Sequence, residues 1–271
     1  MERHQLLAEL HARLSPRNYL EIGTDAGVSL SLSRVPSIGI DPAYSIAAEL
    51  DTDIQLVRAT SDDYFRDHNP CERFGGDPLD FAFIDGMHWA EFALRDYIYV
   101  EAYSTPTSVI VFDDMLPRNV DEAARDRHTI AWTGDVFKVT HVLKALRPDL
   151  VVLEVDTAPT GTVVVLLPDA GSATLVDHYR AVEAAMLEAA DPQELPDRVR
   201  LRTEAVDPAK LLACEWWTTL VDERAGRVPA GSLASALAVQ DWSALRVHQA
   251  VPATVPATAD EGGARRFSFE R

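Results

Sequence analysis

The sequence predicts an α/β protein with a doubly wound, mostly parallel sheet of seven strands, followed by a helical extension. Three observations predict this class. Short apolar runs of strand length recur through the first part of the chain. Helical or loop segments separate them, which is the alternation expected of parallel strands joined by crossover helices. A last pair of runs flanks a Pro/Gly turn, which predicts an antiparallel hairpin at the end of the sheet.

The first predicted element is an amphipathic helix over residues 2–14, where leucines recur at helical spacing ahead of Ser15-Pro16. The five predicted parallel strands are residues 19–22, 37–40, 54–57, 79–84 and 108–112. The segments between them include 45–50 and the longer 89–103, and a helix near 135–146 follows the fifth strand. The predicted hairpin strands are 150–155 and 162–167, joined by residues 157–161.

The chain divides into three predicted parts. Residues 1–170 form the sheet domain, 171–249 a helical extension that acts as a lid or an oligomer interface, and 250–271 a disordered tail. Segments 173–190 and 208–225 have helical patterns, and the second has one apolar face. The tail is rich in Ala, Pro, Thr and Gly, so it has little to bury.

Charge and composition exclude several classes of partner. Twenty-five Lys plus Arg against 43 Asp plus Glu give a formal net charge of -18, which repels nucleic acids and anionic membranes. No run approaches the roughly 18 apolar residues of a membrane helix, and the N-terminus resembles neither a secretory signal nor a transit peptide. We therefore expect a cytoplasmic protein that acts on a small molecule. Its two cysteines are too few for a disulfide framework.

The strongest local signal is the loop after the first predicted strand, which contains Glu21, Gly23, Thr24, Gly27 and Ser29. Gly23 is placed for a tight turn and Gly27 for close packing. The helical turn that begins near Ser29 offers hydrogen-bond donors to a carboxylate. A Gly-x-x-x-Gly pattern occurs by chance in many loops, so the preceding strand gives this one its weight.

Polar side chains also follow the second and third predicted strands. Asp41 comes about one β-α-β unit after the glycine loop, where an acid can accept hydrogen bonds from both hydroxyls of a ribose. The alternative is a turn residue ahead of Pro42. Ser61 and Asp62 are placed to contact an adenine edge, and an N-cap for the residues that follow explains them equally well.

Three aspartates follow the fourth and fifth predicted strands. Asp85 ends the fourth strand, and Asp113 and Asp114 end the fifth. Adjacent parallel strands lie ~4.8 Å apart, so these carboxylates would converge and repel each other. A divalent cation such as Mg²⁺ relieves that repulsion. The alternative, in which Asp113 and Asp114 cap the next loop, explains one acid better than three.

His88 follows Asp85 by three residues, and we predict that these two residues are catalytic. An ordinary histidine pKa of roughly 6.5 suits a general base near neutral pH. With a metal lowering the pKa of a bound hydroxyl, His88 would remove the proton and the alkoxide would attack a sulfonium methyl group. A purely structural histidine is the alternative.

Taken together, residues 19–168 resemble the class I S-adenosylmethionine-dependent methyltransferases, which have a Rossmann-like sheet, and among them the metal-dependent O-methyltransferases. Glu21, Gly23, Gly27 and Ser29 look like the cofactor loop of catechol O-methyltransferase, and Asp41 falls at its ribose-binding acid. The resemblance implies S-adenosylmethionine and a divalent metal such as Mg²⁺ as cofactors.

The same resemblance places Asp85, Asp113 and Asp114 at the three metal ligands. The catechol enzyme has a lysine as base three residues after the first ligand, whereas this chain has His88. That arrangement is similar to the macrocin- and mycinamicin-type sugar O-methyltransferases and implies a sugar or other aliphatic hydroxyl as acceptor. Trp132 lies where the family places substrate-recognition elements and could line an acceptor pocket or belong to the core.

Three alternative functions remain open. A catechol or phenol O-methyltransferase would use the same acids. A nicotinamide-dependent oxidoreductase suits the glycine loop but gives no role to three strand-end aspartates. A non-catalytic S-adenosylmethionine-binding subunit would carry a broken acid/base set, and this set is intact.

Overall fold

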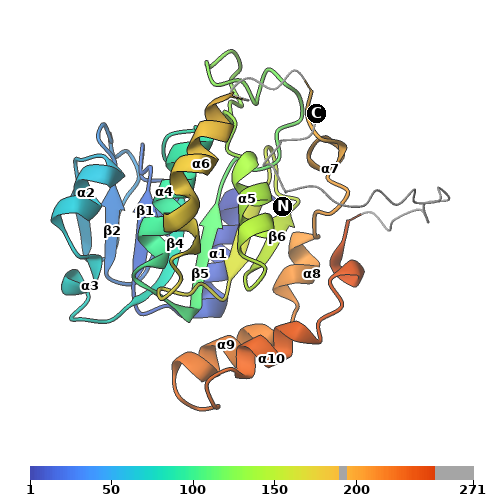
Figure 1. Ribbon diagram of the computed structural model, residues 1–271. Helices are drawn as coiled ribbons and strands as arrows, with labels where there is room; N and C mark the ends of the chain where they lie inside the picture. Colours follow the sequence, from blue (N-terminus) through green and yellow to red (C-terminus); the bar gives the residue numbers. More distant parts are fainter. Residues whose placement is uncertain (189–193, 248–271) are drawn as a thin grey trace.

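The computed structural model describes residues 1–188 and 194–247, and in it a central sheet has helices on both faces (Figure 1). The predicted tail, 250–271, and the end of the predicted helix 173–190 lie outside the described residues. No helix in the described ranges is long and apolar enough to span a membrane.

The sheet contains the seven predicted strands in the order β3-β2-β1-β4-β5-β7-β6. The strands β1 to β5 are parallel, and β7 is antiparallel to both β5 and β6. The direction of the strand order reverses between β1 and β4, and ligands of open α/β sheets bind beyond the C-terminal strand ends at such a point. The bounds are β1 Tyr19–Ile22, β2 Ser37–Ile40, β3 Ile54–Val57, β4 Leu79–Ile84, β5 Ser104–Phe112, β6 Val151–Val155 and β7 Thr162–Leu166.

Three helices cover one face of the sheet, namely α4 (Ala90–Glu101), α5 (Lys138–Leu146) and α6 (Thr174–Glu188). Alternate strand side chains such as Ile84 and Ile110 form a core with them. The predicted helices near 135–146 and over 173–190 are confirmed within the described residues, and the segment 89–103, predicted as helix or loop, contains α4. The helices α2 (Ser61–Asp67) and α3 (Pro70–Arg73) lie at the side of the sheet that contains β2 and β3 (Figure 1).

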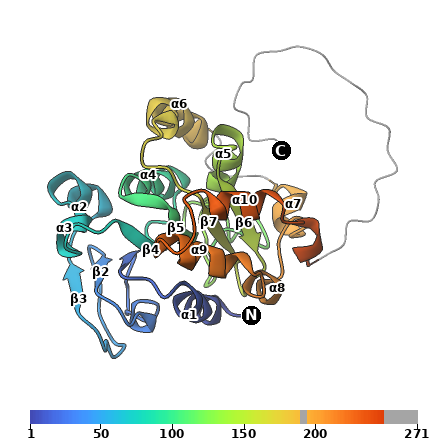
Figure 2. The ribbon, with the colours of Figure 1, turned by 90° about the horizontal axis from the view of Figure 1, so that it is seen from below.

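The opposite face packs against α1 (Arg3–Leu14) and against C-terminal helices, so α1 and α6 lie on opposite sides of the strands (Figure 2). The predicted apolar face of α1 is confirmed, since Leu6, Leu7, Leu10 and Leu14 are fully buried. The C-terminal elements are α7 (Asp197–Arg200), α8 (Pro208–Leu212), α9 (Trp216–Arg224), α10 (Ser232–Ala238) and η2 (Ser243–Leu245).

Helix α9 lies near the N-terminal ends of the sheet strands. Its Arg224 donates hydrogen bonds to the carbonyls of Leu14 and Thr107, at 3.0 and 2.9 Å. The C-terminal ends of β4 and β5 lie at the other edge (Figure 1). The helices α9 and α10 are therefore remote from that end of the sheet.

One predicted helix differs from the structure, and a segment predicted as helix or loop is a loop. The segment 208–225 is broken into α8 and α9, and at the break the Leu211 carbonyl accepts from the Cys214 N–H at 3.2 Å and from the Trp217 indole at 2.9 Å. The segment 45–50 contains no helix. Its N–H groups at Ser45 and Ala47 donate instead to the carbonyls of Asp25 and Ala26, so this segment supports the glycine loop.

The packing of α1 gives a stability prediction. Leu10→Ala should lower the free energy of unfolding by roughly 2–5 kcal/mol, because it leaves a cavity between α1 and the sheet. Leu187→Ala, at a half-exposed position, should change it by no more than about 0.5 kcal/mol. Urea unfolding measures both values, and equal values for the two variants would contradict this packing.

Candidate functional site

The three predicted aspartates lie together at the C-terminal ends of two neighbouring strands. Ile84, the last residue of β4, is in register with Phe112, the last residue of β5. Asp85 directly follows β4 and Asp113 directly follows β5, and the N–H of Asp113 donates to the carbonyl of Ile84 at 3.1 Å. The parallel pairing of β4 and β5 is therefore what brings the acids together.

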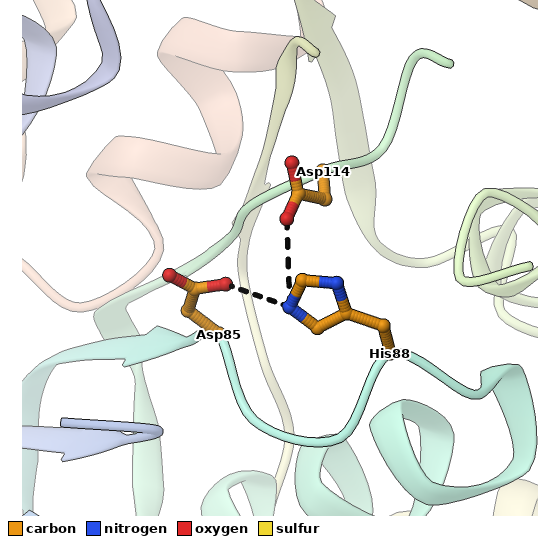
Figure 3. A group of neighbouring side chains, drawn as sticks. All are labelled: Asp85, His88 and Asp114. Carbon is orange, nitrogen blue, oxygen red and sulfur yellow. Dashed lines mark ion pairs between the residues drawn. The ribbon is translucent and has the colours of Figure 1, made fainter. Parts of the chain in front are cut away.

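His88 points between Asp85 and Asp114 (Figure 3). Its Nε2 lies 3.4 Å from Asp85 Oδ1 and 3.5 Å from Asp114 Oδ2. One ligand atom from each of these three residues lies within 4.8 Å of the others. The structure thus joins the predicted base to two of the three predicted metal ligands.

The orientation of His88 depends on Trp132. The carbonyl of Trp132 lies 2.9 Å from His88 Nδ1, and the two rings stack with centroids 4.8 Å apart. An N–H at Nδ1 donating to this carbonyl leaves Nε2 facing the acids. Gly134 permits this approach of the loop, because a Cβ there would lie 1.7 Å from the His88 carbonyl oxygen. Trp132 is half-buried beside the predicted base.

Asp113 is paired differently from its neighbours. Arg3, the first residue of α1, donates from Nη1 to Asp113 Oδ2, and the same nitrogen lies 3.6 Å from Asp85 Oδ2. The Asp113 side chain is only 1% exposed. Sequence reasoning missed Arg3, because it lies 110 positions before Asp113 and belongs to no motif.

The pKa values of Asp113 and Asp114 are both raised. Burial raises the pKa of Asp113 well above its usual range, and the charges of Asp85 and Asp114 raise it further. Burial and the charge of Asp85 also raise the pKa of Asp114, although the Thr160 hydroxyl donates to its Oδ1. The site is therefore short of positive charge.

The same negative charges also raise the pKa of His88, where they favour the charged form of the side chain. Burial lowers the pKa of His88, but the hydrogen bond with Asp85 and the charges of Asp114 and Asp85 outweigh it and raise the pKa to about 9. At neutral pH the imidazole in this arrangement carries its proton and forms ion pairs with Asp85 and Asp114.

The donor atoms at this site fit a divalent cation. Asp85 and Asp114 offer carboxylate oxygens and His88 an imidazole nitrogen, all of which bind divalent ions. The buried Asp113 lies on the same edge and is neutralised by Arg3. A cation bound by all three aspartates, as predicted, would take over that neutralisation.

A buried carboxyl group in β1 stabilises the start of the glycine loop. Glu21 is fully buried and accepts hydrogen bonds from the hydroxyls of Tyr19 and Ser29, at 2.6 and 2.9 Å. Burial raises the pKa of Glu21 to about 8, although these hydrogen bonds act in the opposite direction. In this structure the Ser29 hydroxyl is thus engaged with Glu21.

Gly23 connects the glycine loop to Asp85. It has a φ of +87°, and a Cβ there would lie 1.9 Å from the carbonyl oxygen of Asp85. Gly27 also has a positive φ, +78°, and its Cα faces the Ile46 side chain. The buried hydroxyl of Thr24 lies against β2, 2.9 Å from the place of a Cβ on Gly39. The predicted loop and the predicted metal ligand are therefore in direct contact.

Asp41 lies at the end of β2 beside the glycine loop. Its Oδ2 accepts from the N–H of Asp25 at 2.8 Å, and its Oδ1 accepts from that of Ala43 at 2.6 Å. These bonds are those of a turn residue. A carboxylate has about four acceptor positions, so capacity for a ligand remains.

Ser61 and Asp62 form the first turn of α2, and the N-cap of this helix is Thr60. Asp62 accepts hydrogen bonds from Arg95 at 2.6 Å and from the Tyr99 hydroxyl at 3.1 Å. Ser61 donates to the fully buried Asp96, whose pKa burial raises to about 7 in spite of this bond. Both residues are thus tied to α4.

Comparison with known proteins gives one family match. Residues 20–115 match a family model described as a methyltransferase domain, and this stretch contains the glycine loop and every predicted site residue. No curated protein sequence matches.

Solved structures with a similar fold include the O-methyltransferase TomG from Streptomyces achromogenes, in complex with S-adenosylmethionine. It is 22% identical, with 61% of this chain and 79% of that chain covered and a TM-score of 0.46. Another is the O-methyltransferase from Bacillus cereus in complex with S-adenosylhomocysteine. It is 17% identical, with 61% and 80% covered and a TM-score of 0.44.

The contact at Gly23 can be tested by a matched pair of variants. Gly23→Ala and Gly75→Ala both place a side chain at positive φ, which costs about 1–2 kcal/mol each. Gly75 has nothing within 4 Å, whereas Gly23 meets the Asp85 backbone. We expect Gly23→Ala to lower the free energy of unfolding by roughly 1–3 kcal/mol more than Gly75→Ala. Urea unfolding would contradict the contact if Gly23→Ala were the milder change.

Proposed function

We propose that this chain is an S-adenosylmethionine-dependent, divalent-metal-dependent O-methyltransferase that acts on a hydroxyl of a sugar or glycosylated natural product. The observation that carries the proposal is the position of His88 Nε2 between Asp85 and Asp114. This group lies where the strand order reverses, in contact with the glycine loop through Gly23. The methyltransferase family match over residues 20–115 supports it.

The cofactor is assigned to the C-terminal ends of β1, β2 and β3. In this proposal the backbone of Gly23, Thr24 and Gly27 faces the methionine part, together with Glu21 and Ser29, which shape the loop. Asp41 accepts from the ribose hydroxyls, and Ser61 and Asp62 border the adenine. The transferred methyl group would then lie near Asp85, since Gly23 packs against the carbonyl of that residue.

Asp85, Asp113 and Asp114 are assigned as ligands of a divalent cation, with His88 as the base. When bound, such an ion lowers the pKa of the acceptor hydroxyl and offsets the carboxylate charges that hold a proton on His88. His88 then takes the hydroxyl proton on Nε2, which leaves the acceptor oxygen free to accept the methyl group. The Trp132 carbonyl, bonded to Nδ1, stabilises the imidazolium that forms.

The acceptor class rests on the histidine. His88 lies three residues after Asp85, the offset at which the resemblance to sugar O-methyltransferases arises. The Trp132 ring stacks on His88, so an aromatic side chain borders the place where the acceptor hydroxyl must lie. A screen of macrolide glycosides and oligosaccharides beside catechols tests this assignment. Turnover of catechols alone would contradict it.

Cofactor binding is the first prediction. Isothermal titration of the full chain with S-adenosylhomocysteine should show one site, and Asp41→Asn should weaken it, because the amide accepts less strongly from the ribose hydroxyls. Asp177→Asn makes the same change on the exposed side of α6 and should bind as the wild type does. Absence of binding at millimolar ligand would reject the proposed function.

The base is the second prediction. His88→Ala should lower the turnover of S-adenosylmethionine with an accepted glycoside by roughly 10²–10⁴-fold, since a positioned base contributes that much. Its affinity for S-adenosylhomocysteine should stay within about twofold of wild type, as expected of a residue that acts on the acceptor. His178→Ala, on the exposed side of α6, should leave both quantities unchanged. Unchanged turnover in His88→Ala would remove His88 from the mechanism.

A further inference from the structure

The N-terminus and the β6–β7 turn together hold two groups against the aspartates. The N–H of Arg3 donates to the Ala158 carbonyl at 3.3 Å, and the N–H of Ala158 donates to the Met1 carbonyl at 2.9 Å. Thr160 in the same turn donates to Asp114. The backbone at Arg3 is therefore fixed relative to the acids it pairs with.

Helix α1 strengthens this anchor. Its four leucines are fully buried against the sheet, so the helix cannot shift without opening the core. The Arg3 side chain, in contrast, is 31% exposed. The guanidinium can therefore move into solvent while the backbone of α1 stays in place.

The guanidinium of Arg3 lies against Asp113 and Asp85, two of the residues that would hold the cation. It donates to Oδ2 of Asp113 and is 3.6 Å from Oδ2 of Asp85. An arginine keeps its charge at all accessible pH values. A buried carboxylate without a counter-charge is strongly destabilising, so Asp113 stays ionised only beside this guanidinium or another cation.

We propose that Arg3 is an internal counter-ion that occupies the place of the divalent cation on Asp113 and leaves it when the ion binds. The inference rests on the proposed function for the ion itself and adds that a residue of this chain competes with it. Arg3 stabilises the fold without the ion and weakens the affinity of the site for it. Loading the site thus exchanges one positive group for another on Asp113.

A purely structural ion pair is the rival explanation. In that case the loss of Arg3 would lower stability and leave metal affinity unchanged. If Arg3 instead held Asp113 in place for the metal, its loss would weaken metal binding. Only competition makes the affinity rise when the arginine is removed, because a positive charge next to the ion is then gone.

The experiment measures Mn²⁺ binding by isothermal titration to the full chain as wild type, Arg3→Gln and Arg13→Gln. Arg13 lies on the same helix, is exposed, and is 3.9 Å from Glu9, so its variant loses the same charge away from the site. We expect Arg3→Gln to bind Mn²⁺ at least ~10-fold more tightly than wild type, and Arg13→Gln to match wild type. In EDTA, Arg3→Gln should have a lower Tm than Arg13→Gln, and Mn²⁺ should raise it more.

An Arg3→Gln affinity equal to or weaker than wild type would overturn the proposal, even if the Tm falls. Absence of Mn²⁺ binding in every variant would overturn it as well, and S-adenosylhomocysteine titration of the same samples would show whether the methyltransferase assignment survives. If circular dichroism shows Arg3→Gln unfolded, Arg3→Met replaces it, because methionine keeps an unbranched side chain and good helix propensity but removes the charge. Its Mn²⁺ affinity should exceed that of wild type, and an equal or weaker affinity would overturn the proposal.

Discussion

Electrostatic repulsion among three carboxylates is the constraint on which the C-terminal edge of the sheet depends. Asp85, Asp113 and Asp114 converge because β4 and β5 are parallel neighbours, and burial of Asp113 and Asp114 removes the water that would otherwise screen their charges. Positively charged side chains around the acids offset this repulsion. Arg3, at the start of α1, pairs with Asp113, and His88 forms ion pairs with the other two acids. A divalent cation fits the same constraint, which is why charge links the fold of the N-terminus to the chemistry proposed for the site.

Steric contact couples the cofactor loop to the acids. A side chain at position 23 would collide with the Asp85 carbonyl, so the glycine is needed for the backbone of one motif to touch the other. Segment 45–50 also holds the loop in place, through backbone hydrogen bonds to the carbonyls of Asp25 and Ala26. A methyl donor bound along the loop would thereby lie at a fixed distance from His88. The geometry proposed for methyl transfer is thus set by backbone contacts more than by mobile side chains.

The strands could be predicted from sequence because strands buried on both faces appear as short continuous apolar runs, and α1 because its buried leucines recur at helical spacing. The break between α8 and α9 could not be predicted, since the helical pattern of 208–225 is continuous. The hydrogen bond from the Trp217 indole to the Leu211 carbonyl at the break leaves no mark in that pattern. The convergence of the acids followed from strand adjacency. The role of Arg3 did not, because a contact across 110 positions leaves no local pattern. Sequence likewise could not show that the Ser29 hydroxyl would turn to Glu21, which depends on the burial of that carboxyl group.

The central claim is that a methyl donor and a divalent cation meet at the ends of β1, β4 and β5. A crystal structure of the full chain with S-adenosylhomocysteine and Mn²⁺, recorded at the manganese absorption edge, tests it most directly. The account predicts an anomalous peak bound by Asp85, Asp113 and Asp114, the ligand along the glycine loop, and the Arg3 guanidinium displaced from Asp113. Manganese absent from these acids, or the ligand bound elsewhere, would contradict it.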